Sequence, residues 1–153
     1  LPIAVVDVVL LTLDDPPLVG LISRETPHQG VRWNLVGGRI RYGESIPEAI
    51  QREIDDNLGS GLEVRLPELE RPHFVAQYAP FLKAGFSVDP RKHAVALTYA
   101  VRASGSVAPA KEALGFRWFG LDQLPSRNHW GFEQDRAAEN CLRNAGFFPG
   151  FRR

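Results

Sequence analysis

The order of hydrophobic and polar positions predicts strands, one amphipathic helix, further strands and a closing helix at 132–144. Residues 3–13 are rich in Val, Ile and Leu, as in a strand buried on both faces. Residues 84–91 are polar and turn-rich and are expected to be a loop, and 121–125 are expected to form one helical turn. This order favours an α/β fold, a mixed sheet sandwiched between helices, in one domain over residues 1–153. The other strands are expected at 18–23, 31–36, 61–66, 73–78, 93–103 and 116–120.

The stretch from Gly37 to Gly59 carries the strongest local signal, a glycine pair followed by a loop and an amphipathic helix. Ser45 and Glu48 have the three-residue spacing of a capping box, in which each side chain accepts from the other's backbone N–H. Gly59 is typical of a helix end. Apolar residues recur every four positions and form one stripe for burial, at Ile46, Ile50, Ile54 and Leu58.

Three polar residues of this helix share a face that borders the apolar stripe, because Glu53, Asp56 and Asn57 are spaced three and four positions apart. Arg52 is expected on the opposite, solvated side. Carboxylate and amide oxygens at the margin of a buried surface suit a hard divalent cation such as Mg²⁺. The pattern therefore predicts a metal site along this edge of the helix.

The whole stretch resembles the Nudix box, in which a Gly and a Glu precede an Arg-Glu-apolar triplet, a Glu pair and a final Gly at fixed spacing. The chain matches that pattern at Gly38, Glu44, Arg52, Glu53, Ile54 and Gly59. Asp56 and Asn57 stand where the family has its Glu pair, so the site has one negative charge fewer. The resemblance implies a Nudix α/β/α fold and Mg²⁺ as cofactor, with Mn²⁺ as an alternative.

The resemblance also implies roles for individual side chains. Arg52 is expected to orient the box carboxylates, and the expected catalytic residues are Arg52, Glu53 and Glu112. Loss of one carboxylate at Asn57 predicts weaker metal binding than in the full box. Metal ligands are expected at Gly38, Glu53, Asp56, Asn57 and Glu112.

Residues 22–39 resemble the corresponding stretch of GDP-mannose mannosyl hydrolases, a Nudix subfamily. Arg24, Trp33 and Arg39 fill the positions of a basic residue, an aromatic residue and an arginine there. By this resemblance Arg24 and Arg39 hold the diphosphate, and Asp7 falls where the subfamily keeps an acid near the substrate. Trp33 has two interpretations, a substrate contact or an anchor in the core, and Arg24 is alternatively a surface residue.

Residues 111–125 resemble the Nudix segment in which a metal-binding or catalytic loop precedes a strand with an aromatic-Trp motif. Many members place Glu or Gln in this loop, and Glu112 lies six residues before Trp118. The mannosyl hydrolases have a His directly after it as general base, whereas this chain has Ala113. Glu112 is thus either a base or metal ligand, or an exposed loop acid.

Charge and composition restrict the classes of molecule that the protein is expected to bind. Eighteen basic and eighteen acidic side chains cancel, so no overall positive field favours nucleic acid or an anionic membrane surface. Asp7 interrupts the longest early apolar run, which is too short to span a membrane. Cys141 is the only cysteine, which excludes an intrachain disulfide and fits a reducing, cytoplasmic setting. Because the chain starts at Leu1 and lacks Met, we expect it to begin inside its gene product.

Together these patterns predict a divalent-metal-dependent hydrolase of a nucleoside diphosphate linked to another moiety, with a nucleotide sugar as the first candidate. The expected partner is that small molecule, and a homodimer is compatible with the sequence. The competing interpretation is a Nudix fold kept as a ligand-binding or regulatory module with little catalysis. Asn57 and Ala113 favour that alternative, whereas Glu53, Asp56 and Glu112 favour the enzyme.

Overall fold

The computed structural model describes residues 1–153. Nine strands form one sheet, and two α-helices, α1 (Ile46–Leu58) and α2 (Gln134–Asn144), pack against it. A short 3-10 helix covers Arg127–His129. The strands are β1 (Ile3–Leu11), β2 (Leu18–Thr26), β3 (Gly30–Asn34), β4 (Val36–Arg39), β5 (Leu62–Arg65), β6 (Phe74–Ala79), β7 (Ser87–Val88), β8 (Ala94–Gly105) and β9 (Gly115–Gly120).

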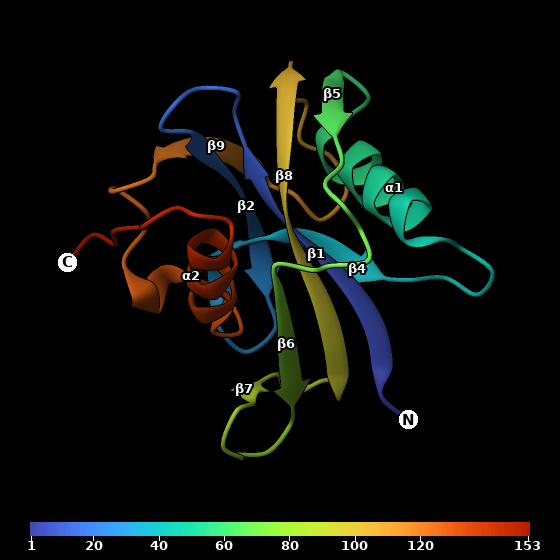
Figure 1. The fold of residues 1–153 in the computed structure, drawn as a ribbon. Helices are drawn as coiled ribbons and strands as arrows, with labels where there is room; N and C mark the ends of the chain where they lie inside the picture. Colours follow the sequence, from blue (N-terminus) through green and yellow to red (C-terminus); the bar gives the residue numbers. More distant parts are fainter.

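The sheet is mixed. Strands β1 and β8 run parallel at its centre, and β2, β4 and β6 are antiparallel to them. The strand order is β3-β2-β1-β8-β6-β7, while β4 pairs with β1, β5 with β8 and β9 with β2. Along one edge of β1, β4 pairs with residues 5–8 and β2 takes over at Leu10 and Leu11. This change of partner leaves β4 packed against α1 (Figure 1).

The two helices cover opposite faces of the sheet (Figure 1). Strand β1 supplies both cores, because successive side chains of a strand point to opposite faces. Val5 and Val9 pack in the core that contains α2, whereas Val6 and Val8 pack in the core that contains α1. The α/β/α arrangement predicted from the sequence is therefore confirmed.

Helix α1 forms as its local sequence predicts. The Ser45 side chain accepts from the Glu48 N–H at 3.3 Å, and the Glu48 carboxylate accepts from the Ser45 N–H at 3.2 Å. Gly59 ends the helix with φ 78°, a backbone conformation that favours glycine. Three of the four stripe residues are completely buried, namely Ile50, Ile54 and Leu58. No helix in the structure combines the length and apolarity that a bilayer span requires.

Three segments differ from the prediction. The expected strand 31–36 is two strands, because at Leu35 the chain leaves β2 and crosses to β1. The expected loop 84–91 contains β7, which pairs with β6. Residues 121–125 form a turn and an isolated bridge, because Leu124 pairs with the C-terminal segment. Each difference depends on a contact between residues far apart in the sequence.

Candidate functional site

Two consecutive glycines of β4 make room for two carboxylates on opposite faces of the sheet. A Cβ added at Gly37 would collide with the Oδ1 atom of Asp7, and a Cβ added at Gly38 would collide with the Glu53 carboxylate. Neighbouring strand residues face opposite ways, so Asp7 lies on the α2 side and Glu53 on the α1 side. A side chain at either glycine would therefore displace one of these two carboxylates.

Arg52 forms hydrogen bonds with two acidic residues of the box, Glu44 and Glu53. Its guanidinium donates to both oxygens of Glu44 at 2.6 and 2.8 Å, to Glu53 at 2.6 Å and to the Arg39 carbonyl at 2.8 Å. These bonds lower the pKa of Glu44 to about 2 and raise the pKa of Arg52. The predicted solvated position of Arg52 is wrong, since its side chain is only 17% exposed. Its geometry suits a residue that orients Glu53.

Asn57 holds the second oxygen of Glu53 and leaves one of its own atoms without a partner. Its Nδ2 donates to the Glu53 carbonyl at 2.9 Å and to Glu53 Oε2 at 3.2 Å. Asn57 is buried, and its Oδ1 accepts no hydrogen bond. A buried acceptor without a donor costs roughly 1–3 kcal/mol. A bound cation is one kind of ligand that would satisfy this oxygen.

The loop before β9 contributes two charged residues to the same site. Lys111, in the left-handed region at φ 52°, pairs with Asp56 at 3.1 Å. Glu112 pairs with Arg24 of β2 at 3.1 Å, and the Glu112 side chain is 62% exposed. No three His, Cys, Asp or Glu side chains converge as ligands of one ion. The loop acid and the α1 acids thus share one site without forming a compact cluster.

These side chains line an open cleft of about 420 Å³ that has no hydrophobic residue in its lining. Only three of the lining side chains are carboxylates, those of Glu53, Asp56 and Glu112. The cleft therefore attracts a polyanion although the charges of the whole chain cancel. The seven cationic side chains are Arg24, Arg39, Arg41, Arg52, Arg91, Lys92 and Lys111.

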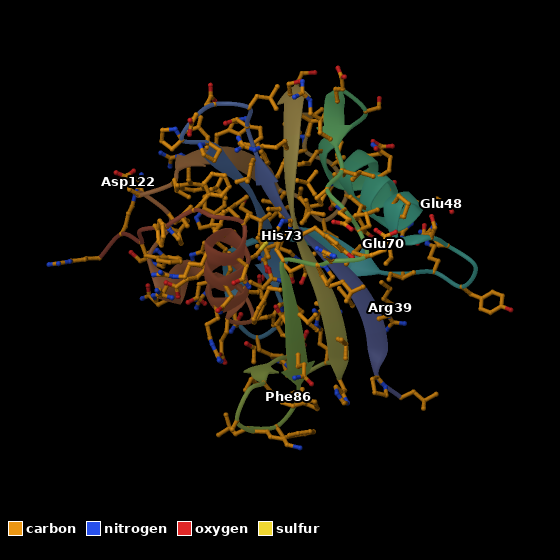
Figure 2. All side chains as sticks on the ribbon, in the orientation of Figure 1. Arg39, Glu48, Glu70, His73, Phe86 and Asp122 are labelled. Atoms are coloured by element: carbon orange, nitrogen blue, oxygen red, sulfur yellow. The ribbon has the colours of Figure 1, made fainter.

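Four of these cations are absent from the site predicted by sequence: Arg41, Arg91, Lys92 and Lys111. Arg91 and Lys92 come from a loop that carries no motif, whereas Arg41 and Lys111 lie in motif segments at positions that the patterns do not specify. The fold brings all four to the cleft. Burial lowers the pKa of Lys92, and the neighbouring Arg91 lowers it further. Figure 2 shows Arg39 at the end of β4, on the side of the molecule where α1 begins.

A second pocket, here called the inner pocket, adjoins the cleft on the α2 side of the sheet and has a volume of about 50 Å³. Asp7 is 4% exposed, and burial raises its pKa to about 7 although Lys92 acts in the opposite direction. The buried Tyr78 hydroxyl has no hydrogen-bond partner. Its charged and aromatic lining residues are Asp7, Arg24, Tyr78, Asp89, Arg91, Lys92 and Phe132.

The predicted substrate residues are thus divided among three places. Arg24 and Arg39 line the cleft, and Asp7 lies in the inner pocket. Trp33 lines neither, because its ring packs edge-on against Phe119 with 4.9 Å between centroids, next to the α2-side core. Trp33 is half-buried, and it also lines a separate open pocket with Arg32 and His129.

The donors on the α1 side fit a hard cation of the Mg²⁺ type. Glu53 and Asp56 offer carboxylates, Asn57 offers an amide oxygen without a partner, and Gly38 lies against Glu53. Mg²⁺ is usually bound by one or two protein carboxylates, with water and substrate phosphates completing its shell. Such a site does not need the cluster of three acids that this cleft lacks.

A family model described as "Domain of unknown function (DUF4916)" matches residues 1–145. The chain belongs to this family. Among solved structures, the DUF4916 chain is similar to a possible asymmetric diadenosine tetraphosphate hydrolase from Jonesia denitrificans. The two share 30% sequence identity with a TM-score of 0.85, over 97% of this chain and 98% of that chain. No curated protein matches the DUF4916 chain significantly.

More distant structures establish the fold. The NUDIX domain of Shewanella oneidensis NrtR, solved with ADP ribose, has 16% identity and a TM-score of 0.68 over 95% of this chain and 89% of that chain. A MutT NUDIX hydrolase from Burkholderia pseudomallei has 23% identity and a TM-score of 0.65 over 92% and 98%. The DUF4916 chain therefore has the Nudix fold, as the resemblance of its box implies.

Proposed function

We propose that this DUF4916 protein is a divalent-metal-dependent hydrolase of a nucleoside diphosphate linked to a second moiety, with a nucleotide sugar as the first candidate. The observation that carries the proposal is a cleft in which seven cations surround the oxygen-rich edge of α1. Cations neutralise the closely spaced charges of a diphosphate during its cleavage. The relatives include a possible diadenosine tetraphosphate hydrolase and a domain bound to ADP ribose, and both compounds contain such a linkage.

In this proposal, different groups of cleft residues bind the metal, orient Glu53 and bind the phosphates. Glu53, Asp56 and Asn57, with the Gly38 carbonyl, would hold Mg²⁺ or Mn²⁺, which neutralises phosphate charge and makes water more acidic. Arg52 orients Glu53 through its 2.6 Å bond. The phosphates are held by guanidinium groups, because their paired N–H donors match phosphate oxygens; the first candidates are Arg24 and Arg39.

Glu112 is the candidate general base, and its ion pair with Arg24 gives it a means of activation. A phosphate group that binds Arg24 competes for the guanidinium that now holds Glu112 at 3.1 Å. The released carboxylate can accept a proton from water. Ala113 occupies the position of the histidine base in the mannosyl hydrolases, so the loop offers no other base of that kind.

A second candidate function is a ligand-binding or regulatory module of the same fold. It is favoured by the pairing of every cleft carboxylate with a cation of the chain. Glu53 pairs with Arg52, Asp56 with Lys111 and Glu112 with Arg24. A cleft balanced in this way still has spare cations for a diphosphate, whether or not cleavage follows.

A substrate panel with product identification tests the proposal. Nucleotide sugars, dinucleoside polyphosphates and nucleoside triphosphates are incubated with the protein and Mg²⁺ or Mn²⁺. Release of free sugar and a nucleoside diphosphate indicates attack at carbon, and release of a nucleoside monophosphate indicates attack at phosphorus. Glu53→Gln should abolish turnover; full activity in this variant would remove α1 from the reaction. Tight binding of a nucleotide sugar without turnover would favour the binding module.

A further inference from the structure

The inner pocket contains a buried hydroxyl group that has no hydrogen-bond partner in the protein, together with a buried carboxyl group. The Tyr78 residue is 5% exposed and its hydroxyl is enclosed without a partner. Asp7 lines the same pocket and is 4% exposed. Buried polar groups are nearly always hydrogen-bonded, because leaving one unpaired is costly. The unpaired Tyr78 hydroxyl therefore indicates a ligand that supplies its partner, and the Asp7 carboxyl group in the same lining offers that ligand an acceptor.

The two carboxyl groups in the lining of the pocket make a phosphate an unfavourable ligand next to them. Asp7 and Asp89 lie in its lining, and Asp89 is already paired with Arg91 at 3.0 Å. Arg24, Arg91 and Lys92 line both the inner pocket and the cleft, so the cations lie where the two pockets meet. A diphosphate held in the cleft would thus keep its charge among the cations, and a group that continues into the inner pocket would be neutral.

The volume of the inner pocket and its hydrogen-bonding groups further restrict which chemical group can bind there. A cavity of about 50 Å³ has room for a few heavy atoms and is too small for a nucleobase. An alcohol hydroxyl both donates and accepts. It can accept from the Tyr78 hydroxyl and donate to an Asp7 oxygen at the same time. Phe132 supplies an apolar wall, over which the Arg91 guanidinium lies 4.4 Å from the ring centre.

We propose that the inner pocket is a subsite for a hydroxyl group of the moiety joined to the diphosphate, with Tyr78 as donor and Asp7 as acceptor. The inference rests on the proposed function, because the cleft must hold the diphosphate for the hydroxyl to reach this pocket. It makes the inner pocket the part of the site that distinguishes a sugar conjugate from a bare nucleoside diphosphate.

The chain offers a matched control for Tyr78. Thr98 is fully buried, its hydroxyl also lacks a partner, and it is the register neighbour of Asp7 on β8. Thr98 does not line the inner pocket. Tyr78→Phe and Thr98→Val therefore each remove one unsatisfied buried hydroxyl, but only the first removes it from the proposed subsite. Neither should lower the thermal stability of the free protein, because no hydrogen bond is lost.

The experiment is calorimetric titration of wild type and both variants with two pairs of probes, ADP-ribose against ADP and GDP-mannose against GDP. We expect wild type to bind at least one conjugate more tightly than its parent diphosphate. Tyr78→Phe should weaken binding of that conjugate about three- to tenfold and leave the parent unchanged, and Thr98→Val should change neither. Equal effects of Tyr78→Phe on conjugate and parent, or no effect, would overturn the subsite.

The two proposals fail in different ways. If wild type binds neither ADP nor GDP nor their conjugates, the diphosphate cleft is refuted and the subsite falls with it. If wild type binds the diphosphates but gains nothing from either sugar, only the subsite is refuted. Stability of the variants is followed by thermal unfolding without ligand, and a lower melting temperature for Tyr78→Phe would also contradict the subsite, because it would mean that the hydroxyl already has a partner.

Discussion

Asp7 should make the folded protein less stable as the pH rises toward neutrality. Its carboxyl group is buried, and desolvation raises its pKa from 3.8 to about 7, with a smaller opposing effect of Lys92. Below pH 3.8 the folded and unfolded chains both hold this proton. Between 3.8 and about 7 only the folded chain keeps it, so the free energy of unfolding falls as the pH increases. Above that range Asp7 is ionised in both states, and its contribution to the free energy of unfolding no longer changes with pH.

The size of the effect follows from the two pKa values. Each pH unit over which only the folded state holds the proton lowers the free energy of unfolding by about 1.4 kcal/mol. The interval from 3.8 to about 7 in the Asp7 pKa therefore corresponds to a loss of about 4 kcal/mol. Domains of this size have total stabilities of roughly 5–15 kcal/mol, so the loss is large enough to measure.

The assay is urea unfolding of wild type and Asp7→Asn at a series of pH values, followed by tryptophan fluorescence. Asparagine cannot ionise, so its advantage over wild type should grow with pH and become constant above about 7. Other carboxyl groups titrate in both proteins and cancel in the difference. Asp14→Asn, a change at an exposed turn residue, should show no such trend. A difference between Asp7→Asn and wild type that stays constant across the pH range would refute the reasoning.

Three further changes test the cleft. Asn57→Glu should tighten Mn²⁺ binding, measured by calorimetry, and lower stability without metal, because it places a second charge beside Glu53; unchanged affinity would mean that position 57 does not face the ion. Arg39→Ala should weaken nucleoside diphosphate binding about ten- to hundredfold, whereas the exposed Arg65→Ala should not; equal affinities would contradict the phosphate contact. Glu112→Gln should lower kcat at least about a hundredfold with diphosphate affinity retained, and weaker metal binding with a smaller kcat loss would make Glu112 a ligand instead.

The sequence predicts best what is decided within a few residues. The cap of α1 forms from Ser45 and Glu48, and the spacing from Gly38 to Asn57 brings the box acids to one edge of one helix. These contacts follow from helix geometry alone. The break at Leu35 does not, because the choice between β2 and β1 as partner depends on the whole sheet.

The same limit applies to the site. Arg91 and Lys92 belong to no motif, and their role depends on a loop that approaches α1 only after folding. Tyr78 reads in the sequence as an ordinary strand residue, and only the structure reveals that its hydroxyl has no partner. Helix periodicity places Arg52 on the solvated side because it ignores the length of the side chain, which reaches back to Glu44. The resemblance to the box, by contrast, implies the orienting role for Arg52.

The glycine pair of β4 makes the site sensitive to insertions and deletions. Adding or removing one residue before Gly37 would turn each glycine toward the opposite face, since side chains alternate along a strand. An insertion would place a residue with a side chain against the carboxylate of Asp7, and a deletion would place Arg39 against that of Glu53. Each carboxylate needs the space that its glycine leaves. Loops around the cleft can change length during evolution without this consequence. The length of the β3–β4 segment is therefore expected to be fixed wherever both acids are retained.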